Sequence, residues 1–592
     1  MTSPTLTRPL IRTRWPAAIR TLGPPAVLVL GLCTWALGVG QLRPPAIGSY
    51  GLLASANPWF LLGLGMVVSG FLIELHRSAA RGWVLGLGIV AVIVAIHATV
   101  PILYGTPEYA WVYKHIGVAL ALGQNGRVTD PSSIYQLWPA LFAATASLGA
   151  LGHVGPLTFA TWAPLAFELA DALVLLAVFR VLSGNRRVAY LAVLLYEGLI
   201  AWVGQDYLSP QAFAYLLWLG VVLILARWLR RPAPVEPRGR LGRLRAPVLA
   251  GLEPPPPTSR RRRAVAIVLV AVIFLVIVAA HQLTPYIALT GVGALVVLGL
   301  IRPWWLVVVL AAIAGGYLIP RYGLIAHDFG GLFSGGNPIQ NASGSRGTHH
   351  AGAEATTALI VRGLAAGMWL LALAAIALRR RSLGRVAFAA GLAFSPFVVL
   401  VAQSYGGEAV YRVYLFSAPW CALLIAGAVY ELRRPQLRWI VVGGVCGAAL
   451  LAGLQGLYGP VAVNAVMPDE LAASGWLYTH TPPGSLIVLA ADNFPALDTA
   501  DYNARQLEVM PADPQIGEAW LDEGNVSEVE SWIAGLGHQS AYVVVSHGMA
   551  AYADYFGAPT GFTRLAHGLP TAPGWTVVYR NADATIYRLT VR

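Results

Sequence analysis

Charged side chains are scarce in this sequence, and lysine is almost absent from it. Asp, Glu, Lys and Arg together make up 11% of the 592 residues, whereas 57% are hydrophobic. Soluble globular proteins carry roughly 25% charged residues, which keep their surfaces in water. The shortage excludes a soluble domain as the main body of the chain. It indicates a protein that crosses a membrane several times.

Cysteines and targeting signals are also few. The three cysteines, Cys33, Cys421 and Cys446, lie inside apolar runs, which excludes a disulfide framework. The formal net charge of +13 comes mostly from arginines in short loops, a pattern of membrane orientation that predicts no nucleic-acid partner. The arginines before the first apolar run are followed by no evident cleavage site, so we expect that run to stay in the membrane.

Long apolar runs are what the sequence does contain. Each suits a hydrocarbon core about 30 Å thick, and together they predict about 13 transmembrane helices. The predicted spans are 24–42, 59–75, 83–101, 160–182, 188–203, 209–227, 264–281, 285–301, 303–320, 355–378, 386–403, 413–430 and 439–457. We therefore expect an all-α polytopic membrane bundle over 24–457, preceded by a basic N-terminus over 1–23.

Arginines are distributed unequally between the two sets of loops. With the N-terminus placed inside, the inner loops receive the arginine clusters, and the outer loops hold only isolated cations. This bias predicts a multi-pass plasma-membrane protein with a cytoplasmic N-terminus and an extracytoplasmic C-terminus. The longest inner loop, 228–263, contains a proline run and the cluster 260–263. It predicts either a disordered tether on anionic membrane lipids or a solvated linker.

The composition changes in the last part of the chain, where acids become common and apolar runs shorten. SLIVLAAD and AYVVVSH predict buried strands, and ELAASGWLYTH and MAAYADYF predict helices. WTVVYRNADATIYRLTV predicts a hairpin around Asn581, Ala582 and Asp583. We expect a small extracytoplasmic α/β domain over 458–592. It has no glycine-rich phosphate loop, Ser-His-Asp spacing or metal signature, so we expect it to cover a site formed elsewhere.

The outer loop 101–159 is too polar to span a bilayer and unusually rich in aromatic residues. Rings with one polar end are typical of the membrane–water boundary. If 108–122 forms a helix lying on the membrane, one face would combine Glu108, Trp111, Val112 and His115. Lys114 is the only lysine in the chain. It either binds a phosphate, which suits a compact ammonium, or extends to the lipid headgroups.

Three short turns carry further polar residues to the same outer boundary. They contain Gln205 with Asp206, His281 with Gln282, and Glu408 with Arg412. Ionisable groups at a membrane are costly, so each turn is a candidate site. The structural alternatives are an i, i+4 pair between Glu408 and Arg412, a helix cap by Asp206 before Ser209, and a helix break satisfied by His281.

Four ionisable residues lie deeper in the predicted spans: Glu168, Asp171, Glu197 and Arg362. Buried carboxylates need a cation, a proton or a water-filled cavity. The three carboxylates either form an internal bridge to Arg362 or His97, or line a path for protons or ions. Both interpretations stay open at this stage.

The second outer loop, 321–354, is rich in Gly, Ser and Asn. Its candidate metal ligands are His327, Asp328, His349 and His350. Adjacent histidines point in different directions on a helix or strand, which disfavours a metal site. We expect a mobile lid over the site instead.

Several short segments carry a resemblance to a known group of enzymes: YAWVYKHIG, IYQLWPALF, VGQDYLSPQ, HQLTPY and YGGEAVYRVYLFSAPW. With the span number, the long outer loop and the outer C-terminal domain, the chain resembles the GT-C superfamily of membrane glycosyltransferases, in an uncharacterised actinobacterial multi-pass branch. GT-C enzymes often carry two adjacent acids in the first outer loop. Here Pro107 precedes a single Glu108, and the acid-bearing loop follows the third predicted span.

The resemblance implies an inverting transfer of sugar from a polyprenyl-phosphate donor to an envelope polysaccharide or glycoprotein, without a cofactor or metal. It implies Glu108 as the catalytic base, with Asp130 and Asp206 as further candidates. Lys114, His115 and Arg412 would hold the leaving phosphate. Tyr109, Trp111 and Trp138 would stack on sugar or polyprenyl. The remaining residues expected at the substrate are Gln205, His281, Gln282 and Glu408.

Two other classes of function compete with this interpretation. A transporter or flippase for a lipid-linked or anionic substrate would use the buried residues Glu168, Asp171, Glu197 and Arg362 as its coupling path. Such proteins often contain inverted repeats, and no convincing repeat is visible in the sequence. A non-catalytic scaffold for envelope assembly is the third class.

Overall fold

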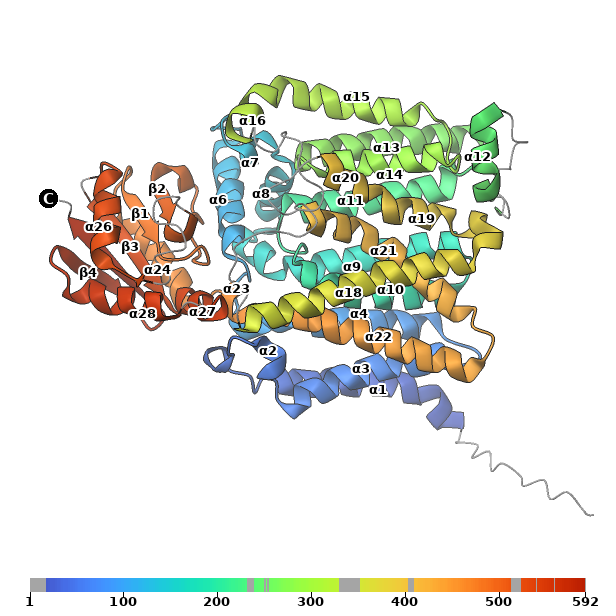
Figure 1. The fold of residues 1–592 in the computed structure, drawn as a ribbon, viewed down its shortest axis with the longest axis horizontal. Helices are drawn as coiled ribbons and strands as arrows, with labels where there is room; N and C mark the ends of the chain where they lie inside the picture. Colours follow the sequence, from blue (N-terminus) through green and yellow to red (C-terminus); the bar gives the residue numbers. More distant parts are fainter. Residues whose placement is uncertain are drawn as a thin grey trace, which may run out of the picture.

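The chain folds into a helical bundle with a small mixed α/β domain at one end (Figure 1). The computed structural model describes residues 17–231, 239–249, 252, 255–329, 352–402, 409–512, 523–538, 540–557 and 559–590. Helix α12 lies at the end of the bundle opposite the α/β domain (Figure 1).

Within the described residues, seven helical stretches are long and apolar enough to cross a membrane: α1 (Ala17–Val39), α3 (Pro58–His76), α11 with its π-helical extension (Pro210–Leu229), α13 (Arg260–Ala280), α18 (Gly352–Leu378), α21 (Ala409–Tyr430) and α22 with α23 (Pro435–Asn464). Five shorter apolar helices accompany them: α4 (Gly82–His97), α8 (Ala140–Gly152), α14 (Thr284–Val297), α15 (Leu306–Leu318, continued to Arg321) and α19 (Ala387–Phe394, continued to Leu400). The mostly helical, multi-span fold is confirmed, and the expected number of about 13 spans is supported only in part.

The other helices of the bundle are α9 (Pro156–Ser183) and α10 (Arg186–Ile200), which contain the deep acids. Short helices complete it: α2 (Gly51–Ala54), α5 (Thr99–Tyr104), α6 (Ala110–Asn125), α7 (Ile134–Leu137), α12 (Gly239–Leu249), α16 (Tyr322–Phe329) and α20 (Val398–Ala402). Because α12 is helical, the tether expected over 228–263 is wrong for 239–249. Residues 330–351, which include His349 and His350 of the expected lid, lie outside the described residues.

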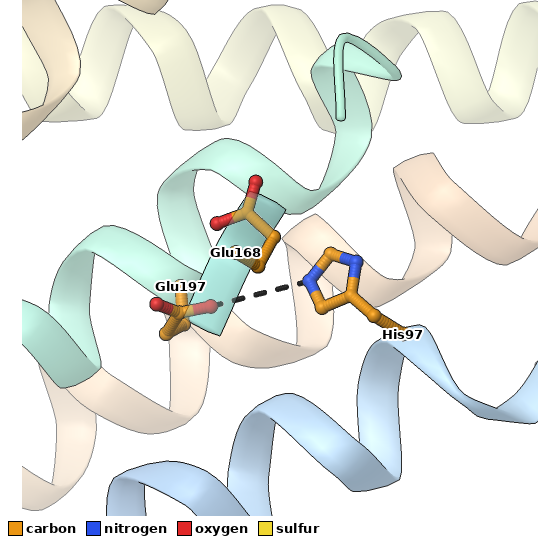
Figure 2. Close-up of side chains that lie close together, drawn as sticks. All are labelled: His97, Glu168 and Glu197. Atoms are coloured by element: carbon orange, nitrogen blue, oxygen red, sulfur yellow. Dashed lines mark ion pairs between the residues drawn. The ribbon is translucent and has the colours of Figure 1, made fainter. Parts of the chain in front are cut away.

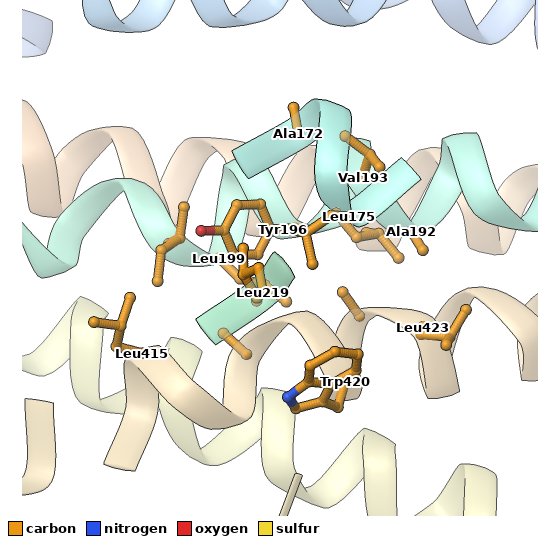
Figure 3. Packing of buried hydrophobic residues seen from close by; sticks show 14 of the residues in the cluster. Ala172, Leu175, Ala192, Val193, Tyr196, Leu199, Leu219, Leu415, Trp420 and Leu423 are labelled. Carbon is orange, nitrogen blue, oxygen red and sulfur yellow. The ribbon is translucent and has the colours of Figure 1, made fainter. Parts of the chain in front are cut away.

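Helix α10 forms the centre of the bundle. Every residue from Val188 to Ile200 is buried, as expected for a helix that is mostly apolar on all sides. Figure 3 shows its side chains packed with those of α9, α11 and α21. Gly198 lies directly against α22, where a Cβ added at Gly453 would collide with the Gly198 carbonyl oxygen. Small residues at this crossing let the two backbones approach closely.

The C-terminal domain is a five-stranded mixed sheet in the order β2-β1-β3-β5-β4. Its strands are β1 (Leu486–Leu489), β2 (Gln506–Val509), β3 (Ser540–Ser546), β4 (Trp575–Arg580) and β5 (Ala584–Thr590), and its helices are α24 (Pro468–His480), α26 (Val526–Gly535), α27 (His547–Tyr555) and α28 (Pro559–Gly568). The strands and helices predicted from the sequence are confirmed, including the β4–β5 hairpin, where Asn581 Oδ1 accepts the Ala584 N–H at 2.8 Å. The sequence analysis missed β2, α26 and α28.

Helix α6 lies across the end of the bundle, between the bundle and the C-terminal domain (Figure 1). Thr106 donates a hydrogen bond to the Val466 carbonyl, and Gln136 donates one to the Tyr502 hydroxyl at 3.1 Å. A Cβ added at Gly117 would collide with the Leu497 carbonyl oxygen. The segment from Thr106 to Gln136 therefore serves as the platform on which the C-terminal domain docks.

Candidate active site at one end of the bundle

The chain between α5 and α6 holds Glu108 at the mouth of the bundle. Helix α6 begins at Ala110, and Tyr109 before it has extended backbone angles, so Glu108 precedes the helix. The expected helical face that joins Glu108 with His115 is therefore wrong, because the helix starts two residues too late to include the carboxylate. The Tyr113 hydroxyl donates to the Pro107 carbonyl at 3.2 Å, which ties this approach segment to the first turn of α6.

Aromatic side chains of α6 enclose the turn that follows α10. The Tyr109 ring stacks on Trp111 at 4.9 Å between centroids and lies 5.4 Å from Tyr207. The His115 ring stacks on Tyr207 at 5.9 Å between centroids, and its Nδ1–H donates to the Leu208 carbonyl at 2.8 Å. The start of α6 and the turn bearing Asp206 therefore form one cluster, although about a hundred residues separate them in sequence.

Glu108 has the surroundings of a proton acceptor. Its Oε1 is buried and accepts no hydrogen bond from the residues that the structure describes. Burial, with a smaller contribution from the negative charge of Asp206, raises the pKa of Glu108 to about 8. A carboxylate whose pKa lies near neutral is matched to the work of a general base or acid.

Asp206 forms a hydrogen bond with a histidine from the far end of α4. Its Oδ2 lies 2.8 Å from His97 Nδ1, and both side chains are buried. The hydroxyl of Ser209 caps α11 by accepting the Ala212 N–H at 3.0 Å. Asp206 is therefore not the cap of this helix. Gly204, at φ +56°, turns the chain here, and a Cβ on it would lie 2.7 Å from the Tyr109 hydroxyl.

His97 also faces a group of carboxylates inside the bundle. Its Nε2 lies 4.0 Å from Glu197 Oε2, and ligand atoms of His97, Glu168 and Glu197 all lie within 4.8 Å of one another (Figure 2). These three side chains could hold a divalent cation. His97 and Glu168, with Asp171 and Asp206, line a cavity of about 10 Å³, which has room for about one water molecule and not for a sugar.

The expected internal bridge runs to His97 and not to Arg362. Arg362 is exposed on α18, on the outer surface of its helix, so it belongs to no buried path. The sequence signal for His97 was weak, because a single histidine at the end of an apolar helix has no recognisable spacing.

Arg412 supplies a buried cation to the same end of the bundle. It donates a hydrogen bond to the Oε1 of Gln205, the residue before Asp206, and its charge acts on His281. His281 Nδ1 accepts the Thr284 N–H at 3.1 Å, so this histidine satisfies the break between α13 and α14, as its structural alternative predicted. Gln282 is half-buried beside it. Glu408 lies outside the described residues, so its pairing with Arg412 stays a prediction.

Some residues expected at the substrate lie away from Glu108, and some of the aromatic rings expected to stack on it are buried. Asp130 Oδ2 accepts a hydrogen bond from Asn503 at 2.7 Å, at the contact with the C-terminal domain. Trp138 is 3% exposed and packs near Tyr317, so it has no free ring face. Tyr109 is 5% exposed and equally enclosed, whereas Trp111 is 47% exposed. Of the three rings, only Trp111 offers a surface on which a ligand can stack.

The two expected phosphate ligands of α6 differ in charge. Burial, together with the charge of Lys114, lowers the pKa of His115 to about 4, although its bond to Leu208 opposes the shift. This shift favours the neutral imidazole, and the expected role of His115 as a phosphate ligand stays a prediction. The Lys114 Nζ lies 4.7 Å from the centre of the Tyr135 ring. Burial lowers its pKa, and Asp130 opposes that shift.

Comparisons with known proteins give structural likenesses only. No family model and no curated protein matches the chain. The fold is similar to ArnT from Cupriavidus metallidurans bound to undecaprenyl phosphate, with 14% identity over 86% of this chain and 98% of that chain and a TM-score of 0.47. It is similar to the apo oligosaccharyltransferase of Archaeoglobus fulgidus, with 14% identity over 81% and 72% and a TM-score of 0.46. It is also similar to the arabinofuranosyltransferase AftD from Mycobacteria, with 16% identity over 87% and 40% and a TM-score of 0.46.

Proposed function

We propose that this protein is an integral membrane glycosyltransferase that moves a sugar from a polyprenyl-phosphate donor to a cell-envelope acceptor on the extracytoplasmic side. The observation that carries the proposal is the enclosed Glu108 carboxyl beside Asp206, at the bundle end that also holds the buried Arg412. An acid with a pKa near neutral and a cation for phosphate are the two groups that this reaction needs.

In the proposed reaction the Glu108 carboxylate accepts the proton of an acceptor hydroxyl. The hydroxyl oxygen then bonds to the anomeric carbon, and the carbon–oxygen bond to phosphate breaks with its electron pair left on the phosphate. A single displacement inverts the anomeric centre. Arg412 stabilises the charge that develops on the leaving phosphate, and the hydrogen bond between Asp206 and His97 holds the Asp206 carboxylate in place.

The arginines support the orientation that we propose. Arg186 and Arg187 donate hydrogen bonds to carbonyl groups of the turn between α3 and α4. At the end of the bundle where α12 lies, Arg245 donates to the Val297 carbonyl and Arg379 donates to the Glu431 carboxylate. By the excess of cations in cytoplasmic loops, this end faces the cytoplasm. Glu108 and the C-terminal domain then face the outside, where lipid-linked sugar is to be used.

The test is Glu108→Gln in membranes supplied with a panel of radiolabelled polyprenyl-phosphate pentoses and hexoses. We expect transfer to fall at least about 100-fold, the usual contribution of a general base, while crosslinking to a photoreactive polyprenyl phosphate is retained. Glu528→Gln, an exposed carboxyl of the C-terminal domain, is the matched control. Full transfer by Glu108→Gln would refute the proposed role.

Movement of protons or cations through the bundle is the second candidate function. It is favoured by the buried group His97, Glu168 and Glu197, where both Glu197 oxygens lack a hydrogen-bond partner among the described residues. In proteoliposomes, Glu168→Gln should then abolish proton-coupled uptake, and the exposed Arg362→Gln should not. If Glu168→Gln leaves every flux unchanged, the buried group is not a transport path.

A further inference from the structure

Four arginines converge on a pocket at the end of the bundle opposite the C-terminal domain. Arg231, Arg245, Arg263 and Arg302 line it, together with Trp304 and Trp305, and its volume is about 560 Å³. The arginines come from four places in the chain: the end of α11, helix α12, the start of α13 and the turn between α14 and α15. The pocket is distant in the fold from Glu108 and has no part in the proposed transfer reaction.

Backbone hydrogen bonds fix two of the four arginines. The Arg231 N–H donates to the Leu300 carbonyl at 2.9 Å, and the Arg302 N–H donates to the Leu229 carbonyl at 2.9 Å. These bonds hold the two chain segments as a short antiparallel pair. The positions of Arg231 and Arg302 at the pocket are therefore set by rigid backbone and not by chance side-chain rotamers.

A glycine makes room for two guanidinium groups to approach one another. Gly299 has φ +74°, and a Cβ on it would lie 3.3 Å from Arg231 Nη1 and 3.2 Å from Arg245 Cδ. Arg245 is held there because its Nε donates to the Val297 carbonyl at 2.7 Å. The Nε of Arg231 is buried and has no hydrogen-bond partner among the described residues.

The charges of the pocket are uncompensated by the described chain. Its described lining contains no aspartate or glutamate. Burial, with the neighbouring charges of Arg302 and Arg245, lowers the pKa of Arg231. Like charges brought together at the edge of a low-dielectric region repel one another. An anion bound in the pocket would therefore reduce the electrostatic repulsion among the arginines.

The surroundings of the pocket are apolar and exposed. Trp304 and Trp305 are 68% and 43% exposed, and Val265 and Val268 on α13 are 51% and 60% exposed. Tryptophan is enriched at the level of the lipid headgroups. If the arginines hold the phosphate of a lipid, the acyl chains of that lipid would lie along the exposed apolar face of α13.

We propose that this pocket binds the phosphate headgroup of an anionic membrane phospholipid. Guanidinium groups bind phosphate oxygens through paired, charge-assisted hydrogen bonds. Basic pockets between transmembrane helices at the cytoplasmic surface are suited to such headgroups. The inference is independent of the proposed glycosyltransferase activity, because it uses none of the residues at the other end of the bundle.

The test uses the full-length protein in nanodiscs of phosphatidylcholine, alone or mixed with phosphatidylglycerol. After extraction, native mass spectrometry counts the lipids that stay bound. We expect the wild-type protein to retain phosphatidylglycerol in preference to phosphatidylcholine, and the double variant Arg231→Gln with Arg302→Gln to retain about tenfold less of it. Arg433→Gln, an exposed arginine in the turn before α22, is the matched control and should retain it fully.

A second measurement separates a misfolded variant from a lost site, and a lipid from a free anion. The double variant should keep the wild-type melting temperature in phosphatidylcholine alone and should lose the rise that phosphatidylglycerol gives the wild type, since a ligand stabilises only the state that binds it. Equal retention of both lipids by the wild type, or unchanged retention by the double variant, overturns the proposal. If inorganic phosphate raised the melting temperature in phosphatidylcholine alone as much as phosphatidylglycerol does, the proposal would also be overturned, because the site would then be one for a free anion.

Discussion

The imidazole of His97 and the carboxylate of Asp206 form a buried hydrogen bond of 2.8 Å across 109 residues of sequence. One partner ends α4, and the other lies in the turn that leads into α11. The bond joins the carboxylates inside the bundle to the aromatic cluster above it, where Glu108 lies.

The pH dependence of transfer should report the ionisation of Glu108. Burial, and then the charge of Asp206, raises the pKa of Glu108 to about 8, well above the usual range of a glutamate. The carboxyl accepts a proton only when ionised, so the initial rate should rise with pH and reach half of its maximum near pH 8. Rates measured in buffers of constant ionic strength test this. A half-maximum near 4.5 would show that another group is the base.

The substitution Asp206→Asn should shift the pH profile toward lower pH. An asparagine Oδ1 still accepts the hydrogen bond from His97, but the negative charge that helps to raise the pKa of Glu108 is gone. Asp206→Leu also breaks the bond and should lower stability by about 1–3 kcal/mol, because His97 Nδ1 is left buried and unsatisfied. Rate–pH profiles and thermal melts are the measurements. An unshifted profile in Asp206→Asn would contradict coupling between the two carboxyl groups.

The substitution Asp130→Asn should leave transfer within about twofold of the wild type, since surface changes of this kind cost less than about 0.5 kcal/mol. Asp130 Oδ1 accepts the Ser132 N–H and Asp130 Oδ2 accepts a hydrogen bond from Asn503 at the contact with the C-terminal domain, and an asparagine keeps one of these two acceptors. The same transfer assay measures the effect. A loss as large as that of Glu108→Gln would restore Asp130 as a candidate base.

The substitution Gly117→Ala should loosen the C-terminal domain. Its new methyl group would collide with the Leu497 carbonyl oxygen, and overpacking of this kind costs about 1–3 kcal/mol. Faster release of the domain by limited proteolysis is the expected result. Gly123→Ala on the same helix is the control, because its methyl group would meet only the side chain of Ala146, at 3.3 Å. Equal protection of both variants would mean that α6 is not the docking platform.

Much of the architecture was predictable because it depends on local composition. Apolar runs predicted where the bundle helices lie, and the acid-rich segment after 458 predicted a mixed domain with its β4–β5 hairpin. The turns bearing Asp206 and Arg412 were recognised as neighbours from topology alone. Helix starts were less predictable. The sequence did not indicate that α6 begins after Glu108, because extended residues before a helix leave no periodic signal.

The sequence by itself determined that this chain is a helical membrane protein with one small mixed domain, since the burial of long apolar runs in lipid needs no information about their partners. Only the tertiary structure decided that His97 binds Asp206, that Asp130 faces Asn503, and that burial lowers the pKa of His115. Those facts depend on which helix faces meet and on how much water they exclude. Neither quantity is written in the spacing of residues along the chain.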